Sequence, residues 1–398
     1  MNRRILALLL VFAMFAALMT GCASGKQETV ANGTAQTEQT ASDQTEAAAE
    51  ETEVEEPVAS AEQPAAEAET LVFTDSLGRE VELPKDITRI APSGAVATMI
   101  LAAIAPECMV TINATPSESQ MAFLPANLAA LPETGQMYGS KANLNLETLL
   151  AADPQVVIDL GDKKGDMTED LNALQEQIGI PVIFIEADLV HMAEAFRTLG
   201  GLLTGKADRG QELADLVDRT TTMAAENSAK ITDDMRVRAM YTTGEDGLGT
   251  NAAGSIQAQV LDMVGVENAI VVEDVSSKGG GNVISLEQLY NFDPDVILFA
   301  EGSIYDTVAD DSAWTQLSAI SSGKYYEIPG SPYNWLSGPP SMNMILGVWW
   351  LGNLIYPEIY DYDMAEMTQE LYKTLWGYSL SNEEVTALLG NSTLKAAK

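Results

Sequence analysis

From residue 71 onward, short apolar runs alternate with segments that have helical periodicity. The runs at 156–160, 181–185 and 296–300 are short and almost entirely apolar, which is typical of strands buried on both faces, and the segment at 87–91 predicts the first core strand. Helical patterns such as residues 95–104 lie between them. This alternation predicts an α/β fold with mostly parallel central sheets and helices on both faces.

One segment of the pattern occurs twice, 140 residues apart. The motif Leu-Glu-x-Leu-x-x-x-Asp-Pro-x-Val begins at Leu146 and again at Leu286, and six of the thirteen positions from these starts are identical. Each copy predicts a short helix that ends at Asp-Pro, because proline disfavours helix in the preceding residue. A buried strand should follow. The repeat predicts two similar lobes, and a cleft between two lobes is where small ligands usually bind.

A single long helical pattern lies between the two halves. Its apolar positions fall on one face at helical spacing, and neither glycine nor proline interrupts it after Gly210. The expected organisation is an N-terminal lobe at 71–206, a connecting helix at 207–230 and a C-terminal lobe at 231–398. A single helix between lobes permits small bending and resists large hinge closure.

The first 21 residues have the pattern of a signal peptide. A basic start precedes an apolar run at 5–18 that is too short to span a bilayer comfortably, and small residues precede Cys22. This resembles the lipobox of bacterial lipoproteins, which implies lipidation of Cys22 and an extracytoplasmic protein anchored to the cell membrane. The alternative is an ordinary secretory signal. Residues 22–70 are acidic and poor in large apolar side chains, which predicts a disordered tether.

Composition excludes several classes of function. The formal net charge is −37, so nucleic acid is not an expected partner. One histidine and two cysteines cannot build the multi-histidine cage of zinc and manganese binding proteins, so we predict no metal site and no cofactor. We find neither Gly-x-Ser-x-Gly, nor a phosphate-loop lysine motif, nor His-Glu-x-x-His, so the sequence does not predict an enzyme. A chelatase-like enzyme with the same two lobes is the less favoured alternative.

Several segments together resemble the substrate-binding lipoproteins of bacterial ABC importers for ferric siderophores, haem and vitamin B12. They are residues 75–84 with the strand at 87–91, the two Leu-Glu segments, and Pro339-Pro340-Ser341. The resemblance covers about residues 71–390. It implies two α/β lobes joined by one long helix, capture of an iron chelate in the cleft, and delivery to an ABC permease.

The resemblance also implies that one glutamate on each lobe pairs with arginines of the permease, and Glu147 and Glu287 match those positions. A carboxylate repeated in both halves suits a two-fold symmetric partner. The alternative is that both are simply favourable charges at helix N-termini.

Ligand-binding residues should come from loops at the carboxyl ends of the strands. The glycine-rich loop 276–281 lets backbone N–H groups approach a ligand, and the loop 333–341 combines prolines with an aromatic pair. The candidates are Ser93, Thr115, Tyr138, Ser140, Lys141, Asn251, Lys278, Gly280, Tyr333, Trp335 and Ser337.

These residues leave the ligand open. Lysines at 141, 163, 164 and 278 would suit an anionic ferric siderophore. Hydroxyl, amide and backbone N–H donors would suit molybdate or tungstate, as at a helix N-terminus. Haem or a corrinoid would require broad aromatic walls.

Overall fold

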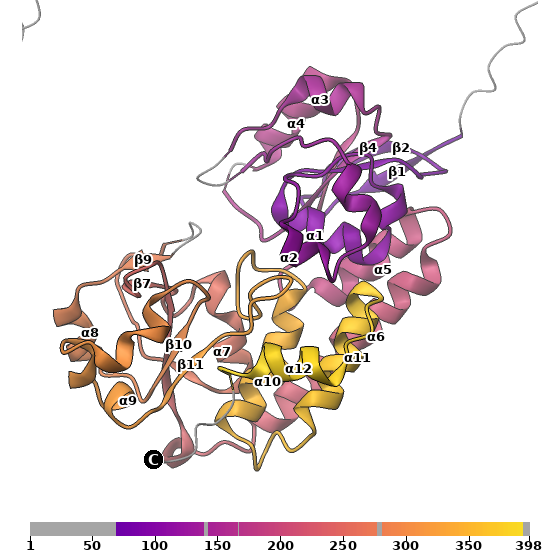
Figure 1. The fold of residues 1–398 in the computed structure, drawn as a ribbon. Coiled ribbons are helices and arrows are strands. Elements are labelled where there is room, and N and C mark those ends of the chain that lie inside the picture. Colours follow the sequence, from indigo (N-terminus) through magenta and orange to yellow (C-terminus); the bar gives the residue numbers. More distant parts are fainter. Residues whose placement is uncertain (1–68, 139–141, 166, 277–280, 393–398) are drawn as a thin grey trace, which may run out of the picture. The chain divides into compact units, whose positions relative to one another are not determined.

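A computed structural model describes residues 69–138, 142–165, 167–276 and 281–392 (Figure 1). These residues form two α/β lobes, as the alternating pattern predicts. Among them, no helix is long and apolar enough to cross a membrane.

The N-terminal lobe is built on a parallel three-stranded sheet in the order β3-β4-β5. Its strands are β3 (Ile90–Pro92), β4 (Val156–Gly161) and β5 (Val182–Glu186). Its helices are α1 (Ala95–Ile104), α2 (Glu118–Met121), α3 (Leu146–Ala151), α4 (Met167–Ile178) and α5 (Met192–Leu202).

Both faces of this sheet are covered by helices. Successive residues of a strand point to opposite faces, so Val156 and Ile158 pack in the core with α1 and α5. Val157 packs in a second core with α3 and α4. The apolar character of Val156, Val157 and Ile158 is therefore explained by burial on both faces.

An antiparallel hairpin of β1 (Thr70–Thr74) and β2 (Glu80–Pro84) precedes this sheet, with Gly78 in the turn at φ 80°. The Arg79 guanidinium lies 2.7 Å from the Asp75 carboxylate, and both side chains are buried. Arg79 also donates a 2.7 Å hydrogen bond to the Val182 carbonyl oxygen, so the ion pair ties the hairpin to β5.

The C-terminal lobe has a mixed sheet in the order β11-β10-β6-β7-β9, with β8 also paired to β6. Strands β8 and β10 pair with β6 in parallel, and β11 pairs with β10 in parallel, whereas β7 is antiparallel to both of its neighbours, β6 and β9. The strands are β6 (Arg238–Thr243), β7 (Gly249–Thr250), β8 (Glu267–Asn268), β9 (Asn282–Val283), β10 (Val296–Phe299) and β11 (Tyr325–Glu327). The helices are α7 (Gln259–Val264), α8 (Leu286–Phe292), α9 (Ser318–Ser321), α10 (Asn343–Ile355), α11 (Met364–Trp376) and α12 (Asn382–Leu389).

Helix α6 (Ala207–Ser228) joins the lobes and lies beside α5 (Figure 1). The sequence predicts this helix over residues 207–230. Its buried apolar side chains belong to one core that contains side chains of both lobes. Arg209 on α6 donates hydrogen bonds to the carbonyl oxygens of Ala103 at 2.9 Å and Thr374 at 2.6 Å. It thereby links the carboxyl ends of α1 and α11.

The sequence repeat is also a structural repeat. In one copy α3 leads into β4, and in the other α8 leads into β10. Asp153 has φ 48° and Asp293 has φ 36°, and both precede proline. A left-handed residue cannot continue a right-handed helix, so each helix ends at its Asp-Pro as expected.

Candidate functional site

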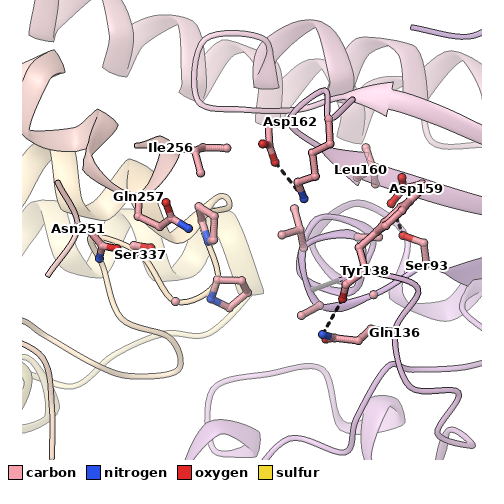
Figure 2. Close-up of a pocket in the computed structure, with 18 of the residues that line it drawn as sticks. Ser93, Gln136, Tyr138, Asp159, Leu160, Asp162, Asn251, Ile256, Gln257 and Ser337 are labelled. Carbon is pink, nitrogen blue, oxygen red and sulfur yellow. Dashed lines mark hydrogen bonds and ion pairs between the residues drawn. The ribbon is translucent and has the colours of Figure 1, made fainter. Parts of the chain in front are cut away.

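A pocket of about 390 Å³ is lined by residues of both lobes (Figure 2). It lies at the carboxyl ends of the parallel strands β3, β4 and β6, where open α/β sheets bind ligands. The N-terminal lobe contributes Ser93, Gly94, Ala95, Val96, Ala97, Gln136, Tyr138, Asp159, Leu160, Asp162 and Lys164. The C-terminal lobe contributes Tyr241, Thr243, Asn251, Ile256, Gln257, Ser337, Gly338, Pro339 and Pro340.

Asp159 is the buried charged group of this pocket. Its residue is 5% exposed, and Oδ1 accepts a hydrogen bond from the Ser93 hydroxyl. Oδ2 is buried and has no hydrogen-bond partner among the described residues. Burial raises the pKa of Asp159 to about 6, while the hydrogen bond from Ser93 and the charge of Lys164 oppose that rise.

A second carboxylate lies nearer the solvent. Asp162 pairs with Lys164 at 3.3 Å, and both side chains are partly exposed. The Lys164 ammonium also lies 5.9 Å from the centroid of the Tyr138 ring. The Tyr138 hydroxyl is buried, and no described residue bonds to it. Burial is the main cause that raises its pKa, followed by the charge of Asp159.

The opposite wall carries two buried amides. Asn251 is 2% exposed and Gln257 is 6% exposed. The side-chain oxygen of each is buried and lacks a partner within the described ranges. Figure 2 shows Asn251, Gln257 and Ser337 across the pocket from Ser93, Tyr138 and Asp159.

Gly281 packs against this amide wall. It has φ 68°, and an added Cβ would lie 2.0 Å from the Thr250 carbonyl oxygen and 2.7 Å from Asn251 Oδ1. Only glycine fits there, so the end of the predicted glycine-rich loop lies beside the pocket.

Helix α1 begins at the pocket. Its N-cap, Gly94, provides no side-chain cap, and the first residues, Ala95 to Ala97, line the pocket. The first N–H groups of a helix have no intrahelical acceptor, so the positive end of the α1 dipole faces the ligand space.

The structure brings four of the predicted ligand residues into the lining: Ser93, Tyr138, Asn251 and Ser337. Thr115 is exposed and Tyr333 is half-buried, and neither lines the pocket. The predicted residues Cys22, Ser140, Lys141, Lys278 and Gly280 lie outside the described residues.

Trp335 is a correction to the sequence interpretation. We expect it at the binding wall, but it is fully buried and packs 6.3 Å, centroid to centroid, from Tyr372. Its carbonyl oxygen would lie 2.2 Å from a Cβ at Gly347, so this loop packs tightly on α10. The polar end of the loop reaches the pocket through Ser337.

The sequence interpretation did not include Asp159, Gln136, Tyr241 and Gln257 among its candidates, although all four line the pocket. The sequence did contain a signal for Asp159, because it is the single charged residue in an otherwise apolar run at 156–160. Gln257 had none, because it belongs to a short turn whose position depends on the packing of the whole lobe.

Glu147 and Glu287 lie in the first turns of α3 and α8, at equivalent places of the two lobes. Both are exposed, and within the described part of the chain neither side chain forms a hydrogen bond or an ion pair. Their helices are capped instead by Asn145, which accepts from the Thr148 N–H at 3.1 Å, and by Ser285, which accepts from the Gln288 N–H at 3.2 Å. Both carboxylates are therefore available to a partner.

Among the described residues, no group of three or more histidine, cysteine, aspartate or glutamate side chains could hold a metal ion. The single histidine, His191, pairs with Asp188 at 2.6 Å on the surface.

Comparisons with known proteins agree with this architecture. The sequence profile of the periplasmic binding protein family matches residues 94–332. No curated protein matches the chain. An ABC transporter solute-binding protein of Sulfurospirillum deleyianum has a similar structure, with TM-score 0.74, 28% identity, and coverage of 80% of this chain and 99% of that one.

Two more distant structures share the fold. A molybdate-bound periplasmic binding protein of Haemophilus influenzae has TM-score 0.65 and 20% identity, over 78% of this chain and 99% of the other. A Helicobacter pylori protein in complex with nickel and histidine has TM-score 0.57 and 15% identity, over 80% and 99%.

Proposed function

The chain belongs to the periplasmic binding protein family, whose members are extracytoplasmic solute-binding proteins of ABC importers, and we propose that its solute is a metal chelate of the ferric siderophore or haem type. The observation that carries this proposal is the pocket of about 390 Å³ that residues of both lobes line. Its volume lies within the range of about 300–1,000 Å³ of small-molecule sites.

The composition of the lining supports an organic ligand. Val96, Ile256, Pro339 and Pro340 offer apolar surface, and hydroxyl, amide and carboxylate groups converge between them. Such a site suits the organic shell of a chelate, which needs apolar contact together with a few oriented hydrogen bonds. The choice of a metal chelate rests on the sequence resemblance.

A second candidate is an oxyanion such as molybdate or tungstate. The N-terminus of α1 faces the pocket without a side-chain cap, and such an end attracts anions. The structurally similar Haemophilus influenzae protein holds molybdate. The ionisable Asp159 beside the same helix opposes an anion.

A thermal unfolding experiment tests the proposal. The full-length protein would be heated with ferric siderophores, haem, cobalamin, molybdate and tungstate in turn. A ligand at 100 times its dissociation constant stabilises the folded state by about 2.7 kcal/mol. Stabilisation by a ferric chelate or haem supports the proposal. Stabilisation by oxyanions alone, or by none of these ligands, contradicts it.

The same proposal includes delivery and anchoring. Glu147 and Glu287 would dock the protein on an ABC permease, and lipid on Cys22 would hold it at the membrane. Cys22→Ala should release the protein from the membrane fraction into the soluble fraction. Retention of this variant in the membrane fraction would contradict the lipid anchor.

A further inference from the structure

We propose that Asp159 selects the solute by accepting a hydrogen bond from a cationic group, so that the chelate taken by this pocket carries a positive charge. This inference rests on the proposed function and specifies its ligand. It assigns the buried carboxylate of the pocket to a positively charged donor on the organic shell, such as a protonated amine.

The geometry of Asp159 supports this assignment. One carboxylate oxygen already accepts from Ser93, and the other is buried at the pocket with no partner among the described residues. A buried carboxylate oxygen without a donor is costly. A cationic donor would satisfy the free oxygen and offset the charge. An anion at the same place would add repulsion.

The other charged groups near Asp159 leave its charge largely uncompensated. Lys164 is the cation among the described lining residues, and it pairs with Asp162 at 3.3 Å where both side chains are partly exposed. The three charged groups of the described lining, Asp159, Asp162 and Lys164, together carry one negative charge when all are ionised. The described lining therefore has a net charge that favours a cation.

The facing wall is also rich in acceptors. The side-chain oxygens of Asn251 and Gln257 are buried and have no partner in the described part of the chain. They would accept further N–H or O–H groups of the ligand from the other lobe. The N–H groups at the start of α1 complement them, because they can donate to carbonyl or hydroxamate oxygens of the same chelate.

The charge of the solute sets the sign of a pH effect. The pKa of Asp159 is about 6, so its carboxylate is mostly ionised at pH 7 and mostly protonated at pH 5. A cationic ligand requires the ionised form, so its affinity should fall on acidification. An anionic ligand favours the protonated form, so its affinity should rise instead.

The test uses the full-length protein and three ferric complexes of one trihydroxamate scaffold. They are ferric desferrioxamine B, whose terminal amine is protonated, its neutral N-acetyl derivative and its anionic N-succinyl derivative. Dissociation constants would be measured at pH 7 and pH 5 for the unmodified protein, Asp159→Asn and Asp162→Asn. Asp162→Asn removes the same charge at the more exposed position.

We expect the cationic complex to bind most tightly at pH 7, and to lose up to about tenfold in affinity at pH 5. Asp159→Asn should weaken its binding by about 10- to 100-fold at pH 7 while changing the neutral complex less than about threefold. Asp162→Asn should have a smaller effect. Retained binding of the neutral complex shows that the variant is folded.

Two results would overturn the inference and are distinguishable. The first result is that the neutral or anionic complex binds as well as the cationic one, or that the affinity of the cationic complex does not fall on acidification. Asp159 then does not select the charge of the solute, while the proposed function in chelate binding stands. The pH comparison on the unmodified protein gives this answer even if Asp159→Asn fails to fold. If none of the three complexes binds, and the unfolding panel also finds no ferric chelate or haem, the proposed function fails together with the inference.

Discussion

Ser93 donates a hydrogen bond from its hydroxyl to Oδ1 of Asp159, across the neighbouring strands β3 and β4. The parallel register pairs Pro92 with Ile158, so the next residue of each strand reaches the pocket side by side. Two residues that are 66 positions apart in the sequence thereby form a hydrogen-bonded pair at the carboxyl edge of the sheet.

Asp159 should make the protein less stable as pH rises from about 4 to about 7. Its folded pKa of about 6 lies above the ordinary value near 4, so the native state binds the proton more tightly than the unfolded chain. The free energy of unfolding then falls as pH rises through this window, by about 1–3 kcal/mol. Urea unfolding of the unmodified protein and of Asp159→Asn at several pH values measures the difference.

The variant isolates this effect because all other titrating groups are common to both proteins. Asp159→Asn should be the more stable protein at pH 7, and the difference should shrink towards pH 4. Ser93→Ala removes a hydrogen bond that lowers the pKa of Asp159, so it should move the window to higher pH. Parallel stability curves for the unmodified protein and Asp159→Asn would contradict the raised pKa.

Local sequence patterns predicted much of the fold. The helical pattern at 95–104 coincides with α1, and Gly78 occupies the predicted hairpin turn. Such features depend on neighbouring residues alone. The two-residue strands β7 and β9 were not predicted, because the pairing of β7 with β6 and of β9 with β7 depends on contacts between distant parts of the lobe.

The sequence predicted which loops form the candidate site better than it predicted which side chains of those loops line the pocket. Ser337 and Trp335 come from the same predicted loop, yet one lines the pocket and the other fills the core. The sequence does not specify which way each side chain points in an irregular loop. Asp159 shows the opposite case, since a lone charge in a buried strand is expensive and is therefore a signal of function.

Because α5 packs closely on α6, replacing each of two glycines by alanine should have opposite effects on the stability of the protein. A Cβ added to Gly210 would lie 2.6 Å from the Phe196 carbonyl oxygen and 2.7 Å from the Gly200 Cα, which are backbone atoms that cannot move alone. Gly210→Ala should therefore destabilise the protein by about 1–3 kcal/mol. Denaturant unfolding measures the change.

Gly201 is the matched control. It lies on α5, and an added Cβ there would meet no atom within 4 Å. Gly201→Ala should therefore stabilise the protein by about 0.5–1 kcal/mol, since alanine loses less conformational entropy in a helix. An equal gain for both variants would show that α5 and α6 are not in close contact.

The ion pair of Asp75 and Arg79 should be one of the larger single contributions to stability. Arg79→Leu would leave the buried Asp75 carboxylate without its cation, and the expected loss is about 3–5 kcal/mol. The control is Lys85→Ala, which breaks an exposed pair with Glu69 and should cost at most about 1 kcal/mol. Similar losses for the two variants would contradict the structural role of the buried pair.

The equivalent positions of Glu147 and Glu287 predict a transport defect without a binding defect. The double variant Glu147→Ala/Glu287→Ala should abolish uptake of a ferric chelate, because both lobes lose the carboxylate proposed to meet the permease. Its affinity for the chelate should be unchanged, because neither residue lines the pocket. Cellular uptake of an iron-labelled chelate and its dissociation constant in solution are the two measurements.

A second double variant separates docking from a simple helix charge. Glu118 and Glu366 are also exposed carboxylates in first turns of helices, and they lie outside the repeat. Glu118→Ala/Glu366→Ala should lose a similar helix-dipole stabilisation of about 0.3–1 kcal/mol per residue and keep full uptake. Normal uptake by the Glu147/Glu287 variant would show that the permease does not need these carboxylates. An equal loss of uptake in both double variants would show that they act on helix stability and not on the permease.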